Sequence, residues 1–121
     1  METHSIPQLV LVVDDQAEIS SAAETMLIEI GVQDVVRAES ASEALLRLDL
    51  EKFDLAILDY NLGMGTGWSV AQRLCRDDIR MIVTTDQDGV RLPPACGGAP
   101  VLKRPYSLNM LATLVASGPD A

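Results

Sequence analysis

Two stretches decide the fold of this 121-residue chain: LVLVVDD at residues 9–15 and LAILD at residues 55–59. Each is a short apolar run, typical of a strand buried on both faces of a sheet, and each ends in carboxylates. Three acids are therefore expected to converge at one edge of the sheet. There they repel one another unless a cation lies among them, which makes this edge the candidate functional centre.

Strand and helix patterns alternate along the chain. Buried strands are expected at residues 8–13, 32–37, 53–58, 79–84 and 101–102. Helices are expected over about residues 19–30, from Ser40 or Ser42 to about 50, over 68–75, and from Ser107 until Gly118-Pro119 ends the last one. The alternation predicts an α/β fold, a doubly wound five-stranded parallel sheet covered by helices on both faces.

The fourth crossover, residues 86–100, departs from this pattern. Gly89, Pro93-Pro94 and Gly97-Gly98 interrupt any helix longer than a turn or two. We therefore expect a degenerate fourth helix in this stretch.

Composition excludes several classes of protein. A hydrophobic content of 48% is enough to offset the entropy lost on folding, so the chain is not a disordered tail. The formal charge of −9 argues against a nucleic-acid partner, because phosphates require a face rich in Lys and Arg. No signal peptide and no membrane-length apolar run is present, so we expect a cytoplasmic protein with no membrane partner. Cys75 and Cys96 belong to no CxxC pair and are expected to be reduced thiols.

The acids at the strand ends indicate a specific chemistry. Asp15 and Asp59 offer the hard oxygen ligands that suit Mg²⁺, and Asp14 is placed to hold one of the waters that this ion retains. With the metal offsetting charge, Asp59 can act as a carboxylate nucleophile toward a phosphoryl group and form an acyl phosphate.

Two other strand ends supply groups that suit the remaining phosphoryl oxygens. Thr85 or Thr84 offers a hydroxyl after the fourth strand, and Lys103-Arg104 brings positive charge after the fifth. A single Asp after a strand is usually a turn or cap residue, so the joint pattern carries the inference.

Taken together, these residues resemble the response-regulator receiver domain of two-component signalling, over roughly residues 8–116. The matching motifs are residues 11–15, residues 54–62, Gly67, Thr85, and a basic residue before Pro105-Tyr106. The resemblance implies the flavodoxin-like strand order 2-1-3-4-5. It also implies that residues 1–121 form a single receiver domain with no output domain.

The resemblance implies a role for each site residue. Asp59 corresponds to the phosphoacceptor, which takes its phosphoryl group from a histidine kinase or a phosphotransfer protein. Asp14 and Asp15 correspond to the magnesium acids, with the backbone carbonyl of Asn61 as the third ligand. The hydroxyl of Thr85 and a basic side chain contact the phosphoryl oxygens. Such a protein signals through a downstream protein partner and catalyses only its own phosphoryl transfer and dephosphorylation.

Three departures from the family pattern place the chain in an atypical branch. Arg104 precedes the proline where the family has lysine, and Lys103 lies one position earlier. Neighbours on a strand point to opposite faces, so the two side chains cannot both enter the site unless the strand bulges. We expect Arg104 to enter it, because a guanidinium can bind phosphoryl oxygens by a two-pronged contact. The resemblance also implies that Pro105 follows a cis peptide bond. Asp86 replaces a small residue, and its negative charge beside the phosphate is expected to slow phosphorylation or to change the lifetime of the phosphate. Val101 replaces a switching aromatic residue.

Other classes of protein remain open at this point. A pseudo-receiver keeps the fold but signals without phosphate, and Arg104 and Asp86 favour it. A haloacid-dehalogenase-type hydrolase also uses an Asp nucleophile and Mg²⁺, but it needs a second Asp where this chain has Asn61. A flavodoxin is disfavoured because the loop after the first strand is acidic instead of rich in phosphate-binding Gly, Ser and Thr.

Overall fold

The structure is a computed structural model that describes residues 6–62, 65–96 and 98–116. Five parallel strands form the main sheet: β1 (Leu9–Val13), β2 (Asp34–Ala38), β3 (Leu55–Asp59), β6 (Arg80–Thr85) and β7 (Val101–Lys103). Their order is β2-β1-β3-β6-β7, which is the predicted order 2-1-3-4-5 when these strands alone are numbered along the chain. The doubly wound parallel sheet is thus confirmed.

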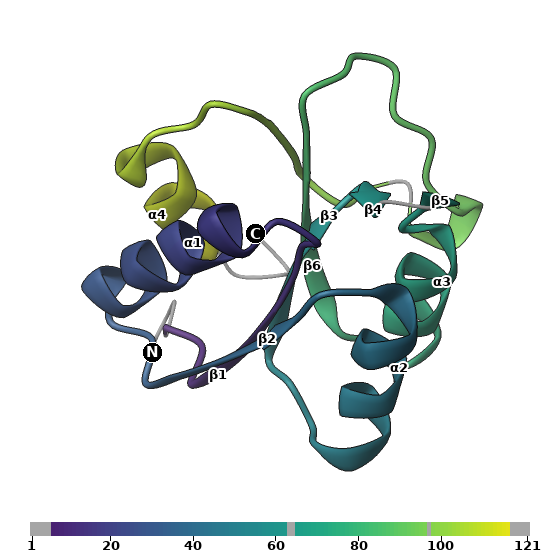
Figure 1. Ribbon diagram of the computed structural model, residues 1–121, viewed down its shortest axis with the longest axis horizontal. Helices are drawn as coiled ribbons and strands as arrows, with labels where there is room; N and C mark the ends of the chain where they lie inside the picture. Colours follow the sequence, from purple (N-terminus) through teal and green to yellow (C-terminus); the bar gives the residue numbers. More distant parts are fainter. Residues whose placement is uncertain (1–5, 63–64, 97, 117–121) are drawn as a thin grey trace.

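Helices cover both faces of this sheet. On one face lie α1 (Ala17–Ile30) and α4 (Leu108–Ala116); on the other lie α2 (Ala41–Leu50) and α3 (Trp68–Arg76) (Figure 1). Gly31, with φ of 121°, ends α1, and the hydroxyl of Ser40 caps α2 by accepting a hydrogen bond from Glu43 N at 3.1 Å. The expected stop of the last helix at Gly118-Pro119 lies outside the described residues.

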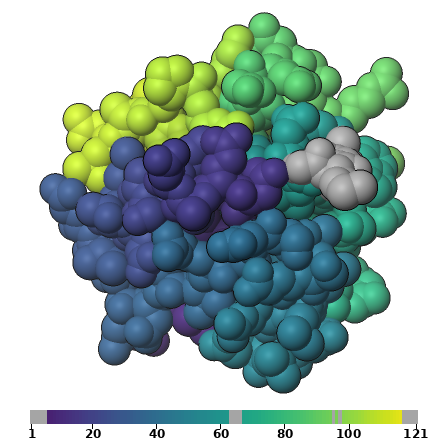
Figure 2. Space-filling model, in the orientation of Figure 1, coloured from purple at the N-terminus to yellow at the C-terminus, as the bar shows by residue number. Residues whose placement is uncertain are grey.

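The core is divided between the two faces because side chains alternate along each strand. Along β1, Val10 and Val12 pack toward α1 and α4, whereas Leu11 and Val13 pack toward α2 and α3. On the face of the molecule drawn in the space-filling view, the first and last helices lie against each other (Figure 2). Of the helices described, none has both the length and the hydropathy required to cross a bilayer.

A small antiparallel pair, which the sequence did not indicate, follows the third strand of the sheet. It consists of β4 (Asn61–Leu62) and β5 (Gly65–Thr66). The chain then returns through Gly67, whose N–H donates to Tyr60 O at 2.6 Å. A Cβ at Gly67 would lie 3.1 Å from Asp59 O and 3.1 Å from Leu58 Cδ1, so this close approach favours glycine.

The fourth crossover is poorly helical, as its Pro and Gly residues predict. Between β6 and β7, the described residues contain only the short 3₁₀ helix η1 (Pro94–Cys96). The part of the crossover before η1 stands as a long loop above the carboxyl ends of the strands (Figure 1). Within residues 86–96 and 98–100 of this crossover, the chain therefore forms no α-helix.

The expectation of reduced cysteines is wrong. Cys75 in the last turn of α3 and Cys96 at the end of η1 form a disulfide, with their Cα atoms 5.8 Å apart. Spacing along the chain gave no indication of this pair because 21 positions separate the two residues and the fold alone brings them together.

Candidate functional site

Three carboxylates meet at the carboxyl edge of the sheet. Asp14 follows β1 directly, Asp15 is the next residue of the loop to α1, and Asp59 is the last residue of β3. Oxygen atoms of the three side chains all lie within 4.8 Å of one another. Asp14 and Asp59 are only 3% and 2% exposed, whereas Asp15 is exposed. The structure therefore brings the three predicted acids into one cluster.

Backbone hydrogen bonds fix the two buried carboxylates. Asp14 Oδ1 accepts from Gln16 N at 2.9 Å, and Asp59 Oδ1 accepts from Asn61 N at 3.2 Å. Each carboxylate thus bonds to the amide two residues later, a local turn for which Asp is well suited. Next to Asp59, the N–H of Tyr60 donates to Thr84 O at 2.9 Å and continues the pairing with β6.

Arg104 is the cation that enters the site. Its Nη1 lies 3.3 Å from Asp14 Oδ2 and its Nη2 lies 3.4 Å from Asp59 Oδ1, and the side chain is 15% exposed. The backbone N–H of Arg104 donates to Thr85 O at 2.7 Å, and a cis peptide bond joins Arg104 to Pro105. Lys103 lies away from the cluster, because its exposed Nζ pairs with Asp88 Oδ1 at 3.0 Å.

The remaining predicted residues lie at the same edge with different exposure. Thr84 and Thr85 are buried at the end of β6, and Thr85 Oγ1 accepts a hydrogen bond from Gln87 N at 3.0 Å. Asp86 is exposed directly after them, and Val101 at the start of β7 is 46% exposed. The exposed aliphatic side chain at position 101 cannot act as an aromatic switch.

The electrostatics of the cluster raise the pKa of its two buried acids. Burial, followed by repulsion from Asp14, raises the pKa of Asp59 from 3.8 to about 6, although Arg104 and the Asn61 amide act in the opposite direction. Burial also raises the pKa of Asp14, against the lowering effects of the Gln16 amide and Arg104. One guanidinium therefore does not offset the cost of holding these charges together.

The cluster fits a small divalent cation. Two oxygens on opposite sides of one Mg²⁺ lie about 4.2 Å apart, so side-chain shifts of less than about 1 Å let these carboxylates share an ion. Three carboxylates beside one guanidinium leave two negative charges, which a divalent cation neutralises. Asn61 Oδ1 is also buried next to Asp59, with no hydrogen-bond partner among the described residues. The donor set therefore suits Mg²⁺.

Sequence reasoning missed the part that two polar residues play around the site. Asp88, in the fourth crossover, holds Lys103 outside the cluster, and Gln16 orients Asp14 through its backbone amide. The alternation of side chains along the fifth strand predicted that Lys103 and Arg104 diverge, but no sequence signal identified Asp88 as the partner of Lys103.

The family model of the response regulator receiver domain matches residues 10–99, and the chain belongs to this family. Receiver domains are signalling modules of two-component systems. A comparison with curated protein sequences finds no match. Solved structures, in contrast, include many similar chains.

Three solved receivers illustrate the similarity. The response regulator TrrA from Thermotoga maritima, in complex with Mg²⁺ and BeF, is 26% identical with a TM-score of 0.79, over 89% of this chain and 96% of its own. SdrG from Sphingomonas melonis is 27% identical with a TM-score of 0.78, over 93% and 96%. A response regulator from Burkholderia pseudomallei with a phosphorylated aspartic acid, calcium ion and citrate is 26% identical with a TM-score of 0.76, over 93% and 68%.

Proposed function

We propose that this protein is a phospho-accepting receiver in which Asp59 takes a phosphoryl group from a histidine kinase or a phosphotransfer protein. The observation that carries the proposal is the buried carboxylate of Asp59, which lies within 4.8 Å of two other acids and within 3.4 Å of a guanidinium. The solved relatives that hold BeF or a phosphorylated aspartic acid support the same chemistry.

In the proposed transfer, an oxygen of Asp59 attacks the phosphorus of a phosphohistidine. The P–N bond breaks, its electron pair stays on the imidazole nitrogen, and an acyl phosphate forms on Asp59. Mg²⁺, when bound by Asp15, Asp59 and the backbone carbonyl of Asn61 with Asp14 holding a metal-bound water, offsets the charge on the phosphoryl oxygens. The local geometry keeps Asp59 oriented, because Asn61 N donates to one of its oxygens.

Arg104 and Thr85 are the groups we assign to the phosphoryl oxygens. The Arg104 guanidinium, already at two carboxylates, can bind two oxygens of a planar or tetrahedral anion at once. Thr85 is fully buried at the end of β6, and its hydroxyl is the donor expected for a third oxygen. Lys103 would reach the phosphate only after leaving Asp88. Signalling then passes through a downstream protein partner.

The proposal is tested by incubating the protein with Mg²⁺ and acetyl phosphate and reading its intact mass. Wild type should gain one phosphoryl group, and Asp59→Asn should gain none. Asp54→Asn is the matched control because Asp54 lies just before the same strand, at its opposite end, where Oδ2 accepts from the amides of Gln8 and Leu9. This control should be phosphorylated like wild type. No added mass on wild type, or equal mass on Asp59→Asn, overturns the proposal.

A pseudo-receiver is the second candidate, and the position of Arg104 favours it. The guanidinium already contacts two of the three carboxylates, so the site has a resident cation of its own. Mg²⁺ titration separates the candidates: the fluorescence of Trp68, which follows Gly67, and the amide shifts near Asp59 should saturate in a phospho-accepting receiver. A pseudo-receiver with Arg104 in place of the metal should show no saturable change.

A further inference from the structure

The Cys75–Cys96 pair lies in a part of the molecule that the proposed phosphoryl chemistry does not use. The two cysteine residues differ in exposure. Cys96 is 5% exposed and belongs to the core, with its Sγ 3.4 Å from Ala71 O. Cys75 is half-buried and lines an open groove of about 840 Å³ between α2, α3 and the fourth crossover. A small molecule in this groove can therefore approach Cys75.

We propose that this pair is a thiol–disulfide exchange site at which a small anionic thiol, of the glutathione class, attacks Cys75. The groove has the size of a site for such a molecule, and Arg76 on its wall offers positive charge to an incoming thiolate, whereas Arg73 is paired with Asp49 and Asp77. Arg76 is the more available of the two, since its side chain is 72% exposed.

The exchange balances in two steps. The thiolate of the reagent attacks Cys75 Sγ, the bond to Cys96 breaks, and the electron pair leaves on Cys96, which takes up a proton. A second thiol then attacks the reagent sulfur of the mixed disulfide and releases Cys75 as a thiol. Two reagent thiols are thereby oxidised to one small disulfide while the protein pair is reduced, and the small disulfide reverses the reaction.

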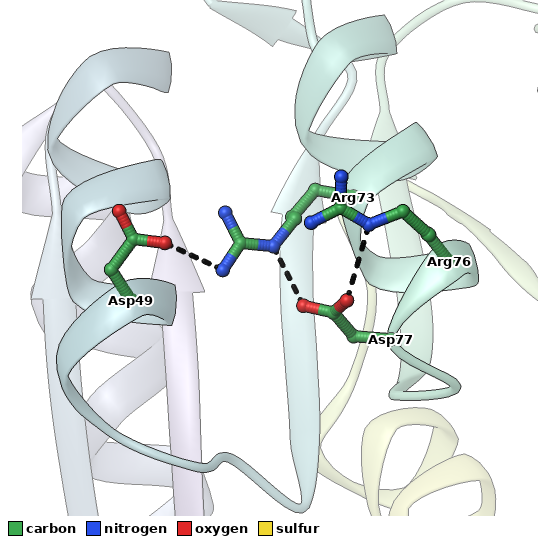
Figure 3. A network of polar contacts seen from close by, with 4 residues as sticks. All are labelled: Asp49, Arg73, Arg76 and Asp77. Carbon is green, nitrogen blue, oxygen red and sulfur yellow. Dashed lines mark hydrogen bonds and ion pairs between the residues drawn. The ribbon is translucent and has the colours of Figure 1, made fainter.

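The helix that carries Cys75, α3, is held in place by contacts other than the disulfide. Arg73, one turn above the end of α3, donates to Asp49 of α2 at 2.7 Å and to Asp77 at 2.6 Å (Figure 3). Arg76 adds a contact to Asp77 at 3.4 Å. The same helix buries three apolar side chains: Val70, Ala71 and Leu74. Breaking the disulfide therefore leaves α3 in place.

The crossover that carries Cys96 is the half that the disulfide restrains. Val90, Leu92 and Ala99 of the crossover pack against the core, and at its end Pro100 O accepts from Val83 N at 2.9 Å. The backbone hydrogen bonds around η1, from Cys96 N to Pro93 O and from Ala99 N to Cys96 O, stay within the crossover, so the disulfide is the covalent restraint on this part. Near its start, Asp88 is held by the exposed Lys103. This stretch follows Thr85 directly, so the redox state of the pair should set how firmly residues 86–96 are held beside the edge of the sheet.

Single-cysteine variants test which sulfur reacts. Cys96→Ser leaves Cys75 as the one thiol, and Cys75→Ser leaves Cys96. With an aromatic disulfide reagent and no denaturant, the Cys96→Ser protein should react at least about tenfold faster, because its thiol faces the groove. Equal rates, or a faster Cys75→Ser protein, contradict the assignment.

Wild type tests the link itself. Protein quenched in acid and alkylated should gain no alkyl groups, and after treatment with reduced glutathione in native buffer it should gain two. Hydrogen exchange of residues 87–96 should then be at least about tenfold faster, while β3 stays protected, and oxidised glutathione should restore the slow exchange. The proposal is overturned if the untreated protein is already alkylated, or if glutathione reduces the disulfide only in denaturant. It is also overturned if hydrogen exchange of residues 87–96 is the same before and after reduction. Asp59→Asn should behave like wild type, so the result is independent of phosphoryl acceptance.

Discussion

At the scale of single residues, Asp59 is both buried and ionisable, and burial disfavours its charged form. It is 2% exposed, so its charge loses most of its hydration, yet it lies beside two further carboxylates and one guanidinium. Such a residue destabilises the metal-free fold at neutral pH and is well placed to gain when charge is neutralised. The same features that make it a poor structural residue make it a suitable acceptor.

The pH dependence of stability follows from this pKa. The folded-state pKa of Asp59 is about 6 and its ordinary value is 3.8, so the folded state binds more protons than the unfolded state between these values. The free energy of unfolding, measured by urea denaturation in EDTA, should therefore fall as the pH rises from about 4 to 6, by up to about 3 kcal/mol. Asp59→Asn should remove the part of this fall that Asp59 contributes, leaving the part due to the raised pKa of Asp14, and should be the more stable protein at pH 7. A wild-type curve that rises over this window contradicts the account.

Arg104 and Lys103 form a natural pair for testing charge in the site. Arg104→Met removes the cation that competes for Asp14 and Asp59, so Mg²⁺ should bind more tightly, by about 1–2 kcal/mol or roughly 5- to 30-fold. Lys103→Met removes an exposed charge paired with Asp88 and should change Mg²⁺ affinity by less than about twofold. Isothermal titration calorimetry measures both. Equal effects of the two substitutions would mean that Arg104 has no special place in the site.

At the scale of elements, the regular strands and helices were predictable from apolar runs and helical spacing, with ends shifted by one or two residues. The third strand, expected at 53–58, is observed as Leu55–Asp59, so Asp59 is a strand residue and not the first residue of a loop. The β4–β5 pair was missed because strands of two residues leave no periodic signal. The degenerate fourth helix was predictable because Pro and Gly act locally.

The close approach of the chain at Gly67 predicts that a substitution there lowers the stability of the protein. A methyl group there would lie 3.1 Å from both Asp59 O and Leu58 Cδ1, so Gly67→Ala should force the end of β3 to move. We expect a loss of about 1–3 kcal/mol in the free energy of unfolding. Gly98→Ala is the matched control, since a methyl group at that position would meet no atom of another segment within 4 Å, and its effect should be below about 1 kcal/mol. Urea denaturation measures the free energy of unfolding of both variants. Similar losses of stability in the two would contradict a specific close approach at Gly67.

At the scale of the whole molecule, the site could be predicted because strand ends in a parallel sheet share one edge. Asp14, Asp59 and Thr85 are far apart in sequence, yet parallel pairing of β1, β3 and β6 places them together. The Cys75–Cys96 pair could not be predicted in the same way. It depends on where an irregular crossover packs against α3, and no repeating pattern encodes that placement.

Binding of Mg²⁺ should stabilise the entire fold, because only the folded chain brings the three acids together. A ligand that binds only the folded state adds about 2.7 kcal/mol to the free energy of unfolding at a concentration of 100 times Kd. Thermal unfolding with Mg²⁺ and with EDTA should show this difference in wild type, and Asp15→Asn, which changes an exposed ligand, should reduce it. An identical Tm with and without Mg²⁺ would contradict a metal site in this cluster.

The most direct measurement is an experimental structure with Mg²⁺ and beryllofluoride, a phosphoryl mimic. We predict Mg²⁺ bound by Asp15, Asp59 and the carbonyl of Asn61, beryllium bonded to an oxygen of Asp59, and the Arg104 guanidinium on the fluorines. A metal bound elsewhere, or Asp59 left unmodified with Arg104 still joining it to Asp14, would contradict the claim that these carboxylates form a phosphoryl-accepting magnesium site.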